Sequence, residues 1–403
     1  MLEQSYRELN KNAAVGVDSV TYEEYGRNLQ DNLINLEQRL KQKRYRAKLV
    51  RRAFIPKSNG EQRPLGIPAL EDKIVQNLAR RILEALYEPL FADCSYAYRP
   101  NLSARQAVEK LQEQLRHKFV WVVEADIRKF FDSINHEILI QMLEKRVNDQ
   151  AFIRLIRKWL NAGVLNADGS VEQPTCGTPQ GGIVSPILAN IYLHYALDLW
   201  YKNDIEKRSG GESLFVRYAD DFVAAFRYHK DAASFYRRLK TRLKKFSLDV
   251  AEEKTRKLMF NRFRKEASET FSFLGFEFRW VKTRRGIDTV RVTTSPKRLQ
   301  RIAAEFTAWC KKHCNRRIAW IMGMVKAKLM GLRNYFGVPG NSIQVRKVYS
   351  IFKLILYRRL NRRSERRSYN WKTFMQMWDY FNVSHLQRLN NEGIQLSFAQ
   401  YLR

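Results

Sequence analysis

The sequence predicts an α+β fold in two parts, with mixed helices and strands over residues 1–290 and helices alone over residues 291–403. Three observations support this prediction. Two apolar, β-rich runs end in carboxylates, one at Asp126 and one at the pair Asp220 and Asp221. Amphipathic helical periodicity surrounds these runs. The balance of charge changes near residue 290, and 403 residues are enough for two or three cores.

Helices and one hairpin are expected before the first carboxylate. Asn59-Gly60 between two apolar segments predicts a β-hairpin, with Lys57 and Arg63 on its two arms. In chain order, the elements expected are helices over residues 1–49 with a break at 13–18, the hairpin over 51–68, and helices over 72–90 and 103–118.

The carboxylates lie at the ends of apolar strands. Residues 119–126 form a β-rich run that ends at Asp126, and residues 214–226 form two apolar strands that meet at Asp220 and Asp221. The other elements expected are helices over 183–200 and 231–248, then helices throughout 291–403, with Pro296 near one helix start and a turn at 338–341.

The charge of the chain indicates a polyanionic partner. There are 73 Lys and Arg against 41 Asp and Glu, a formal net charge of +32. Such a charge repels itself unless it meets a polyanion, so nucleic acid is the expected partner. Residues 291–403 hold 23 Lys and Arg and 4 Asp and Glu, which puts +19 of the excess there. Because no apolar run approaches the roughly 20 residues of a spanning helix, we expect a soluble intracellular protein without membrane contact.

Three carboxylates at two strand ends suit the binding of two Mg²⁺ ions. In-line phosphoryl transfer uses two such ions, held by a dense cluster of hard oxygen ligands. An Asp at a strand end commonly stabilises a turn, and for Asp126 alone that interpretation is favoured. Adjacent carboxylates in an apolar hairpin, however, repel and are costly to bury without cations. We therefore predict that Asp126, Asp220 and Asp221 bind two Mg²⁺ ions, which requires their strands to be sheet neighbours.

Four segments in order resemble the group II intron-encoded reverse transcriptases and maturases, in the bacterial form without an endonuclease domain. They are Ile55-Pro-Lys57-x-Asn-Gly-x-x-Arg63-Pro-Leu-Gly-Ile-Pro68, Asp126-Ile-x-x-Phe-Phe131-Asp132, Gly177-Thr-Pro-Gln180-Gly-Gly-x-x-Ser-Pro-x-Leu-Ala-Asn190 and Tyr218-Ala-Asp-Asp221. The likeness runs from Gly16 to Trp371, nearly the whole chain. It implies a right-hand polymerase, with fingers, palm and an antiparallel palm sheet in residues 1–290 and an α-helical thumb/maturase domain in residues 291–403.

The resemblance also implies roles for residues near the carboxylates. The Ile127 carbonyl joins the three aspartates in holding metal. Phe131 lies under the sugar, where its ring would exclude a ribose 2′-hydroxyl; plain core packing is the alternative, and it is preferred for Phe130. Lys57 and Arg63 reach the triphosphate, although outside the motif they would read as surface charges.

Other roles follow from the same resemblance. Gln180 packs against the incoming nucleotide, and Lys254 matches a position that protonates the leaving pyrophosphate. The segment Phe273, Leu274 and Gly275 resembles the grip on the primer end.

The basic C-terminal part carries the expected RNA-binding residues. Leu329-Met-Gly-Leu-Arg333-Asn-Tyr-Phe336 resembles the thumb segment of the family, with Leu332 in place of the usual Trp. Residues 358–367 add six arginines near Tyr357, Tyr369 and Trp371, a mixture that suits phosphates and unpaired bases. These arginines are Arg358, Arg359, Arg362, Arg363, Arg366 and Arg367.

We expect a bacterial, cytoplasmic RNA-directed DNA polymerase that uses an RNA template, a DNA or RNA primer and deoxynucleoside triphosphates. It would also bind a structured group II intron RNA, in support of splicing and retrohoming. One alternative is a free-standing enzyme in phage defence, spacer acquisition or DNA repair. Another is a non-catalytic splicing factor, and that hypothesis predicts damaged carboxylates.

Since no Cys-rich or His-Asn-His segment follows, we expect no cutting of target DNA. The short segment before Gly16 also predicts a reduced template-clamping extension.

Overall fold

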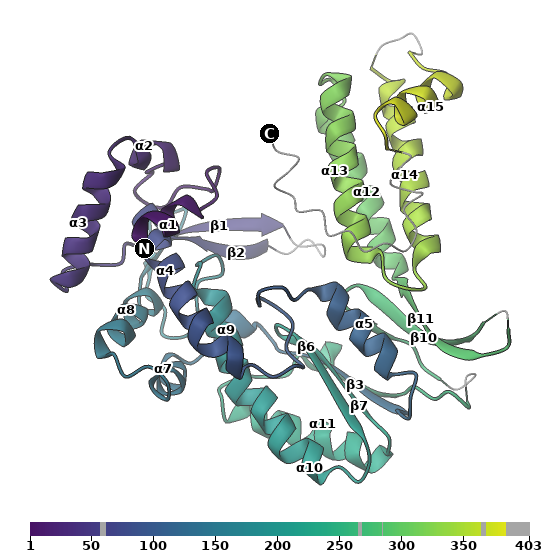
Figure 1. Cartoon of the computed structure of the whole chain (residues 1–403), viewed down its shortest axis with the longest axis horizontal. Helices are drawn as coiled ribbons and strands as arrows, with labels where there is room; N and C mark the ends of the chain where they lie inside the picture. Colours follow the sequence, from purple (N-terminus) through teal and green to yellow (C-terminus); the bar gives the residue numbers. More distant parts are fainter. Residues whose placement is uncertain (57–61, 265–267, 284, 364–367, 384–403) are drawn as a thin grey trace. The chain divides into compact units, whose positions relative to one another are not determined.

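The computed structural model describes residues 1–56, 62–264, 268–283, 285–363 and 368–383 (Figure 1). The chain divides into two compact units, Met1–Glu269 and Thr270–Arg403. Helices and antiparallel sheets occur in both units, which agrees with the predicted α+β class. The division at residue 269 precedes the change of composition near 290, so a three-stranded sheet belongs to the same unit as the basic helices.

Helices and a hairpin form the start of the first unit. The predicted hairpin is confirmed, because β1 (Val50–Pro56) pairs antiparallel with β2 (Gln62–Ile67) from Arg51 opposite Ile67 to Pro56 opposite Gln62. Two short strands that were not predicted extend this sheet in the order β2-β1-β4-β5. The elements are α1 (Leu2–Arg7), α2 (Tyr22–Arg27), α3 (Leu29–Lys41), β4 (Val164–Leu165) and β5 (Val171–Glu172).

A second, four-stranded sheet lies in the core of the first unit, with the order β6-β7-β3-β8 and antiparallel pairing throughout. Its members are β3 (Trp121–Asp126), β6 (Ser213–Tyr218), β7 (Asp221–Phe226) and β8 (Arg256–Met259). Every residue of β7 after Asp221 is buried, as an apolar run without alternation indicates. The neighbouring positions of β3 and β7 confirm the pairing that the carboxylate prediction requires.

Helices pack around this sheet. Most of α4 (Leu70–Tyr87) is buried. The helix predicted over 183–200 is observed as α9 (Ser185–Leu193), which continues through two π-helical turns. The other helical elements of the first unit are α5 (Ala104–Gln114), α6 (Phe130–Ser133), α7 (His136–Glu144), α8 (Gln150–Leu160), the π-helical turns His194–Asp198 and Tyr201–Ile205, α10 (Glu206–Arg208), α11 (His229–Lys244) and the 3-10 helical turns Glu88–Leu90 and Glu252–Lys254.

The second unit combines a small sheet with long helices (Figure 1). The prediction of helices alone from residue 291 is wrong for residues 291–294, because these residues end strand β11. Val290 and Val292 face the core with the two-residue period of a strand, and β11 pairs along its length with β10. The elements are β9 (Phe271–Phe273), β10 (Phe276–Lys282), β11 (Asp288–Thr294), α12 (Pro296–His313), α13 (Ile318–Phe336), α14 (Ser342–Leu360) and α15 (Trp371–Tyr380).

Among the described residues from 296 onward, the prediction of helices is confirmed. Pro296 is the first residue of α12, and the turn over 338–341 separates α13 from α14. Within the ranges that the structure describes, none of the helices has both the length and the apolar character that crossing a membrane requires.

Candidate active site

Two of the three predicted aspartates face each other across paired strands. Asp126 ends β3 and is directly opposite Asp221, the first residue of β7. Tyr218 of β6 is also paired with Asp221, so Ala219 and Asp220 form a two-residue turn between β6 and β7. Ala219 has a left-handed backbone with φ of 56°, an uncommon conformation for a residue with a side chain. The fold therefore brings Asp126, Asp220 and Asp221 together at one end of β3 and β7, the two central strands of the sheet.

The charged side chains at these strand ends influence one another. Burial raises the pKa of Asp220 above its ordinary value, and the negative charge of Asp126 raises it further. The Lys254 ammonium donates to Asp126 Oδ2 at 2.5 Å, and this hydrogen bond raises the pKa of Lys254. The backbone N–H of Ala251 donates to the Asp126 carbonyl at 2.8 Å, which fixes the turn that carries Lys254. Lys254 and Asp126, both predicted site residues, are thus in direct contact.

The chemistry of these donors suits a divalent cation. In the described part of the chain, no three His, Cys, Asp or Glu side chains are arranged as a ready metal site. The Asp126 carboxylate is instead bound to Lys254. Hard carboxylate oxygens on two paired strands and their turn are nevertheless the ligands that Mg²⁺ prefers, and repulsion between Asp220 and Asp126 is relieved by a cation. Ile127, whose carbonyl is a predicted ligand, is buried and forms a β-bridge with Val250.

A glycine-rich loop brings together two predicted nucleotide-binding residues. Arg63 of β2 donates from Nε to Gln180 Oε1 at 2.7 Å, and the Gly66 N–H donates to the Gln180 carbonyl at 2.7 Å. Gly181 has φ of +119°, and a Cβ atom there would lie 2.5 Å from the Gly66 carbonyl oxygen. Only glycine allows this close approach. Lys57, on the other arm of the hairpin, lies outside the described residues.

Phe131 lies at the edge of the apolar core. It is 8% exposed, and its ring centroid is 5.5 Å from that of Phe130 and 6.5 Å from that of Tyr98. Tyr98 is 45% exposed and has a left-handed backbone with φ of 56°. Phe130 is fully within the core, in agreement with the packing role preferred for it. The structure gives Phe131 core contacts as well, and its selection of the sugar stays a prediction.

A buried ion pair beneath the acidic turn was not predicted from the sequence. Arg217 is completely buried, and its guanidinium donates to both carboxylate oxygens of Asp198 at 2.7 and 2.6 Å. It also donates to Ser95 Oγ at 2.7 Å, to Asn190 Oδ1 at 3.3 Å and to the Ala219 carbonyl at 3.2 Å. The last contact holds the peptide that precedes Asp220. We call Arg217, Asp198, Asn190 and Ser95 the Arg217 network.

The predicted primer-grip segment forms a tight hairpin in the second unit. Phe273 ends β9, and Leu274 and Gly275 have left-handed backbones with φ of 53° and 80°. Two such residues in succession are typical of the turn that joins antiparallel strands most closely. The Leu274 carbonyl accepts from the Tyr335 hydroxyl at 3.0 Å.

The predicted RNA-binding arginines divide into two places in the second unit. Arg358 and Arg359 lie in the last turn of α14, and Arg363 Nη2 donates to the Arg316 carbonyl just before α13 at 3.2 Å. Arg333 lies fifteen residues along α13 from its start, roughly 22 Å away along the helix axis. Arg362 is exposed. Arg366 and Arg367 lie outside the described residues.

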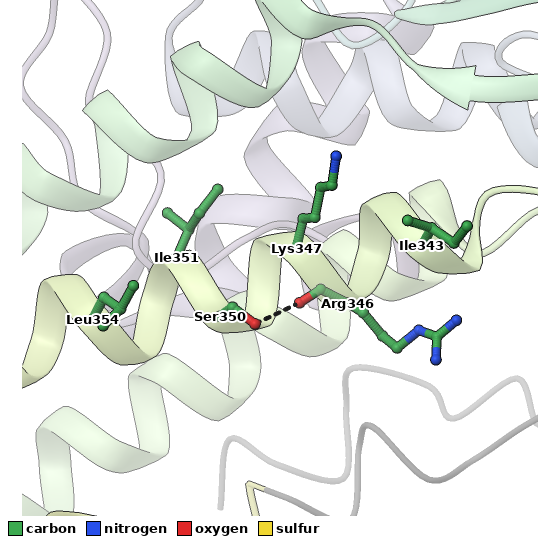
Figure 2. A pocket seen from close by; sticks show the side chains of 6 residues that line it. All are labelled: Ile343, Arg346, Lys347, Ser350, Ile351 and Leu354. Carbon is green, nitrogen blue, oxygen red and sulfur yellow. Dashed lines mark hydrogen bonds between the residues drawn. The ribbon is translucent and has the colours of Figure 1, made fainter. Parts of the chain in front are cut away.

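One face of α14 also carries cations beside apolar side chains. Its residues line a hollow of about 450 Å³ (Figure 2). Figure 2 shows the side chains of Arg346 and Lys347 extending away from the helix on different sides, while Ser350 Oγ donates to the Arg346 carbonyl at 3.2 Å. The lining residues are Ile343, Arg346, Lys347, Ser350, Ile351 and Leu354.

Comparison with known proteins gives a family match over most of the first unit. Residues 55–278 match the family described as reverse transcriptase (RNA-dependent DNA polymerase). This range includes the three aspartates, Arg63, Gln180 and Lys254.

Relatives with curated descriptions include intron-encoded proteins. An uncharacterized 91 kDa protein in a cob intron of Schizosaccharomyces pombe is 41% identical, over 47% of this chain and 24% of its own length. Protein YkfC of Escherichia coli is 34% identical, over 52% of this chain and 62% of its own length. The group II intron-encoded protein LtrA of Lactococcus lactis is 31% identical, over 62% of this chain and 50% of its own length. The chain therefore spans less than two thirds of each of these relatives.

Proposed function

The chain belongs to the reverse transcriptase (RNA-dependent DNA polymerase) family, of the group II intron-encoded kind, and we propose that it extends a primer with deoxynucleotides on an RNA template. The observation that carries this proposal is the pairing of Asp126 with Asp221, beside Asp220, at the ends of the two central strands of the four-stranded sheet. In the proposal this sheet is the palm, the β1–β2 hairpin belongs to the fingers, and the helices after residue 290 are the thumb/maturase domain.

The three aspartates and the Ile127 carbonyl would hold two Mg²⁺ ions. When bound, such ions activate the primer 3′-hydroxyl and stabilise the leaving pyrophosphate. Repulsion between Asp220 and Asp126 in a half-buried setting favours the binding of cations there.

The remaining side chains bind and orient the nucleotide. Arg63 and Lys57 attract the triphosphate, and the hydrogen bond from Arg63 to Gln180 holds the guanidinium in one orientation. Phe131 limits the space at the sugar. Lys254 carries a proton on Nζ next to Asp126, where the departing pyrophosphate can take it.

The same protein would bind a structured group II intron RNA and support splicing and retrohoming. The support for this second activity is the charge of +19 over residues 291–403 and the relation to proteins named for the introns that encode them. Arginines at the end of α14 supply hydrogen-bond donors for RNA phosphates, and such contacts do not depend on the RNA sequence.

Primer extension on an RNA template with deoxynucleotides and Mg²⁺ tests the proposal. We expect DNA product from the native protein, and Asp221→Asn should reduce extension by roughly a thousandfold or more, because metal binding accounts for several kcal/mol of the barrier. RNA affinity should stay within about twofold of native, since the arginines supply it. Asp31→Asn, the same chemical change on the exposed side of α3, should leave both properties unchanged.

Two results would contradict the proposal in different ways. Equal loss of extension and RNA binding in Asp221→Asn would mean that the aspartate serves folding rather than chemistry. No product from folded native protein that still binds RNA would favour a non-catalytic splicing factor.

A further inference from the structure

Four aromatic rings form a continuous stack across the helices of the second unit. Phe352 of α14 lies against Phe306 of α12 with centroids 3.6 Å apart and planes 11° from parallel. Phe306 is followed by Trp309 at 5.7 Å and 13°, and Trp309 by Trp320 of α13 at 6.0 Å and 19°. Phe352 and Phe306 are buried, whereas Trp320 is 42% exposed. This aromatic stack therefore starts in the core and ends at the surface.

Two cationic side chains lie over the rings at the outer end of the stack. The Arg316 guanidinium lies 5.9 Å from the centroid of the Trp320 ring, and Lys328 Nζ lies 5.2 Å from that of Trp309. The His313 ring is 5.5 Å from Trp320. Arg363, which follows α14, donates to the Arg316 carbonyl and therefore lies beside Arg316. Residues 306–364 contain 14 Lys and Arg and no Asp or Glu, so no acid from this stretch neutralises the surface.

Packing between α12 and α13 does not by itself account for this arrangement. An aliphatic side chain would fill the contact between two helices equally well and would expose less aromatic surface to water. A partly exposed ring that stacks on Trp309 and has the Arg316 guanidinium over it suits a partner with its own flat ring and a phosphate. Nucleic-acid bases stack on aromatic side chains in this way. Arginine alone contacts phosphates whatever the base, so it does not distinguish paired from unpaired bases.

We propose that the exposed face of Trp320 is a stacking site for an unpaired base of bound RNA, with Arg316 and Arg363 contacting the adjoining phosphates. The inference rests on the proposed function as an RNA-binding protein and adds to it a preference for unpaired over paired nucleotides. Bases within a duplex are covered by their neighbours, so the site selects single-stranded or bulged nucleotides.

Binding of a short, unstructured single-stranded RNA tests the proposal. The full-length protein is first saturated with a primer–template duplex, and the RNA is then added either intact or with abasic positions that keep every phosphate. We expect the native protein to bind the intact RNA about tenfold more tightly than the abasic RNA. Trp320→Leu should bind both equally, and Trp320→Phe, which keeps a ring, should retain most of the preference. Intact RNA should quench the tryptophan fluorescence of both variants less than that of the native protein, because both lack the Trp320 indole.

A matched control variant and the melting temperature of each Trp320 variant separate a loss of base stacking from misfolding. Phe263 is 85% exposed beside Arg262 in the first unit, and Phe263→Leu should keep the native preference. Equal binding of intact and abasic RNA by the native protein would overturn the proposal, as would a preserved preference in a folded Trp320→Leu protein. Primer extension measured in parallel shows whether the polymerase activity fails independently, because Trp320→Leu should still extend the preloaded duplex.

Discussion

At the scale of single residues, Arg217 determines the surroundings of the acidic turn. Its side chain is fully buried, yet each of its nitrogens has an acceptor, and two of these acceptors are the oxygens of Asp198. A buried ion pair contributes little net stability, because both charges lose their hydration. The value of Arg217 lies instead in the donor it gives to the Ala219 carbonyl, one residue before Asp220.

Replacement of Arg217 separates its effect on stability from its effect on the turn. Arg217→Met should lower the free energy of unfolding by about 3–5 kcal/mol, because Asp198 is left as an unpaired buried charge. Arg217→Met combined with Asp198→Leu should recover most of that stability, but primer extension should stay at least about tenfold below native, since the Ala219 carbonyl still lacks its donor. Denaturant unfolding and single-turnover extension measure the two effects.

An exposed ion pair provides the control for this experiment. Arg157→Met breaks the pair between Arg157 and Glu137 at the surface and should cost less than about 1 kcal/mol. Native rates of extension in the double variant would show that the Arg217 network stabilises the fold without positioning the turn.

The sequence was sufficient to predict that the strands carrying the aspartates are neighbours, but not this network. Asp220 and Asp221 interrupt an apolar hairpin, and an unusual local pattern of that kind indicates a site. The signal for the network was a lone arginine within an apolar strand and Asp198 between Leu197 and Leu199. Each charge is recognisable as one that needs a partner when buried. Their pairing depends on how a helix packs on the sheet, which no local pattern contains.

At the scale of secondary-structure elements, one carboxylate joins three segments of the first unit. Asp72 of α4 is buried and accepts hydrogen bonds from the Tyr45 hydroxyl and from the backbone N–H of Lys48. Trp159 of α8 donates from Nε1 to the Tyr45 hydroxyl at 3.0 Å. Burial raises the pKa of Asp72 to about 6, although the two hydrogen bonds oppose this shift.

This pKa predicts a pH dependence of stability. The unfolded chain loses the Asp72 proton near pH 4, whereas the folded protein keeps it until about pH 6. The contribution of Asp72 is therefore fully present below pH 4 and is lost as the pH rises through 6, by about 3 kcal/mol at most. Asp72→Asn should remove this decline, so the variant gains stability relative to native protein between pH 4 and 7 in denaturant titrations. Asp31→Asn should follow the native curve; a parallel Asp72→Asn curve would contradict the prediction.

The elements themselves were predictable where a local signal was strong. Asn59-Gly60 predicted the β1–β2 hairpin, and Pro296 predicted the start of α12. Strands β4 and β5 have two residues each, too few for a pattern, and exist because β4 pairs with β1. The sequence pattern after the change of composition favoured helices from residue 291, but the pairing of β11 with β10 decides the structure of residues 291–294.

At the scale of the whole molecule, charge and packing divide the chain at different points. The excess of cations becomes denser near residue 290, whereas the compact units meet at residue 269. The charge composition indicates which part of the chain is expected to meet a polyanion, whereas packing determines which residues share a core. The sheet of β9, β10 and β11 therefore lies mostly before the change of composition but belongs by its contacts to the same unit as the basic helices.

The cations at the end of α14 should determine the salt dependence of RNA binding. Replacing Arg358, Arg359, Arg362 and Arg363 by Gln should weaken RNA affinity and flatten the slope of log affinity against log salt, by about 0.7–0.9 for each phosphate that is no longer neutralised. A control with the same change of charge replaces exposed cations of the first unit, namely Lys145, Arg154, Lys202 and Lys207. Filter binding over a range of salt concentrations measures both slopes, and equal slopes would place the RNA elsewhere.

The Arg217 network also has a consequence for the order of events during folding. Its hydrogen bond between Ser95 and Arg217 joins positions 122 residues apart, and contacts of such long range form late because a large loop must close first. The hairpin that carries Asp220 can pair locally much earlier. We expect the Arg217 guanidinium to hold the peptide before Asp220 in place only once Ser95, Asn190 and Asp198, which all precede it in the chain, have packed around it, so the acidic turn should acquire its final shape late in folding.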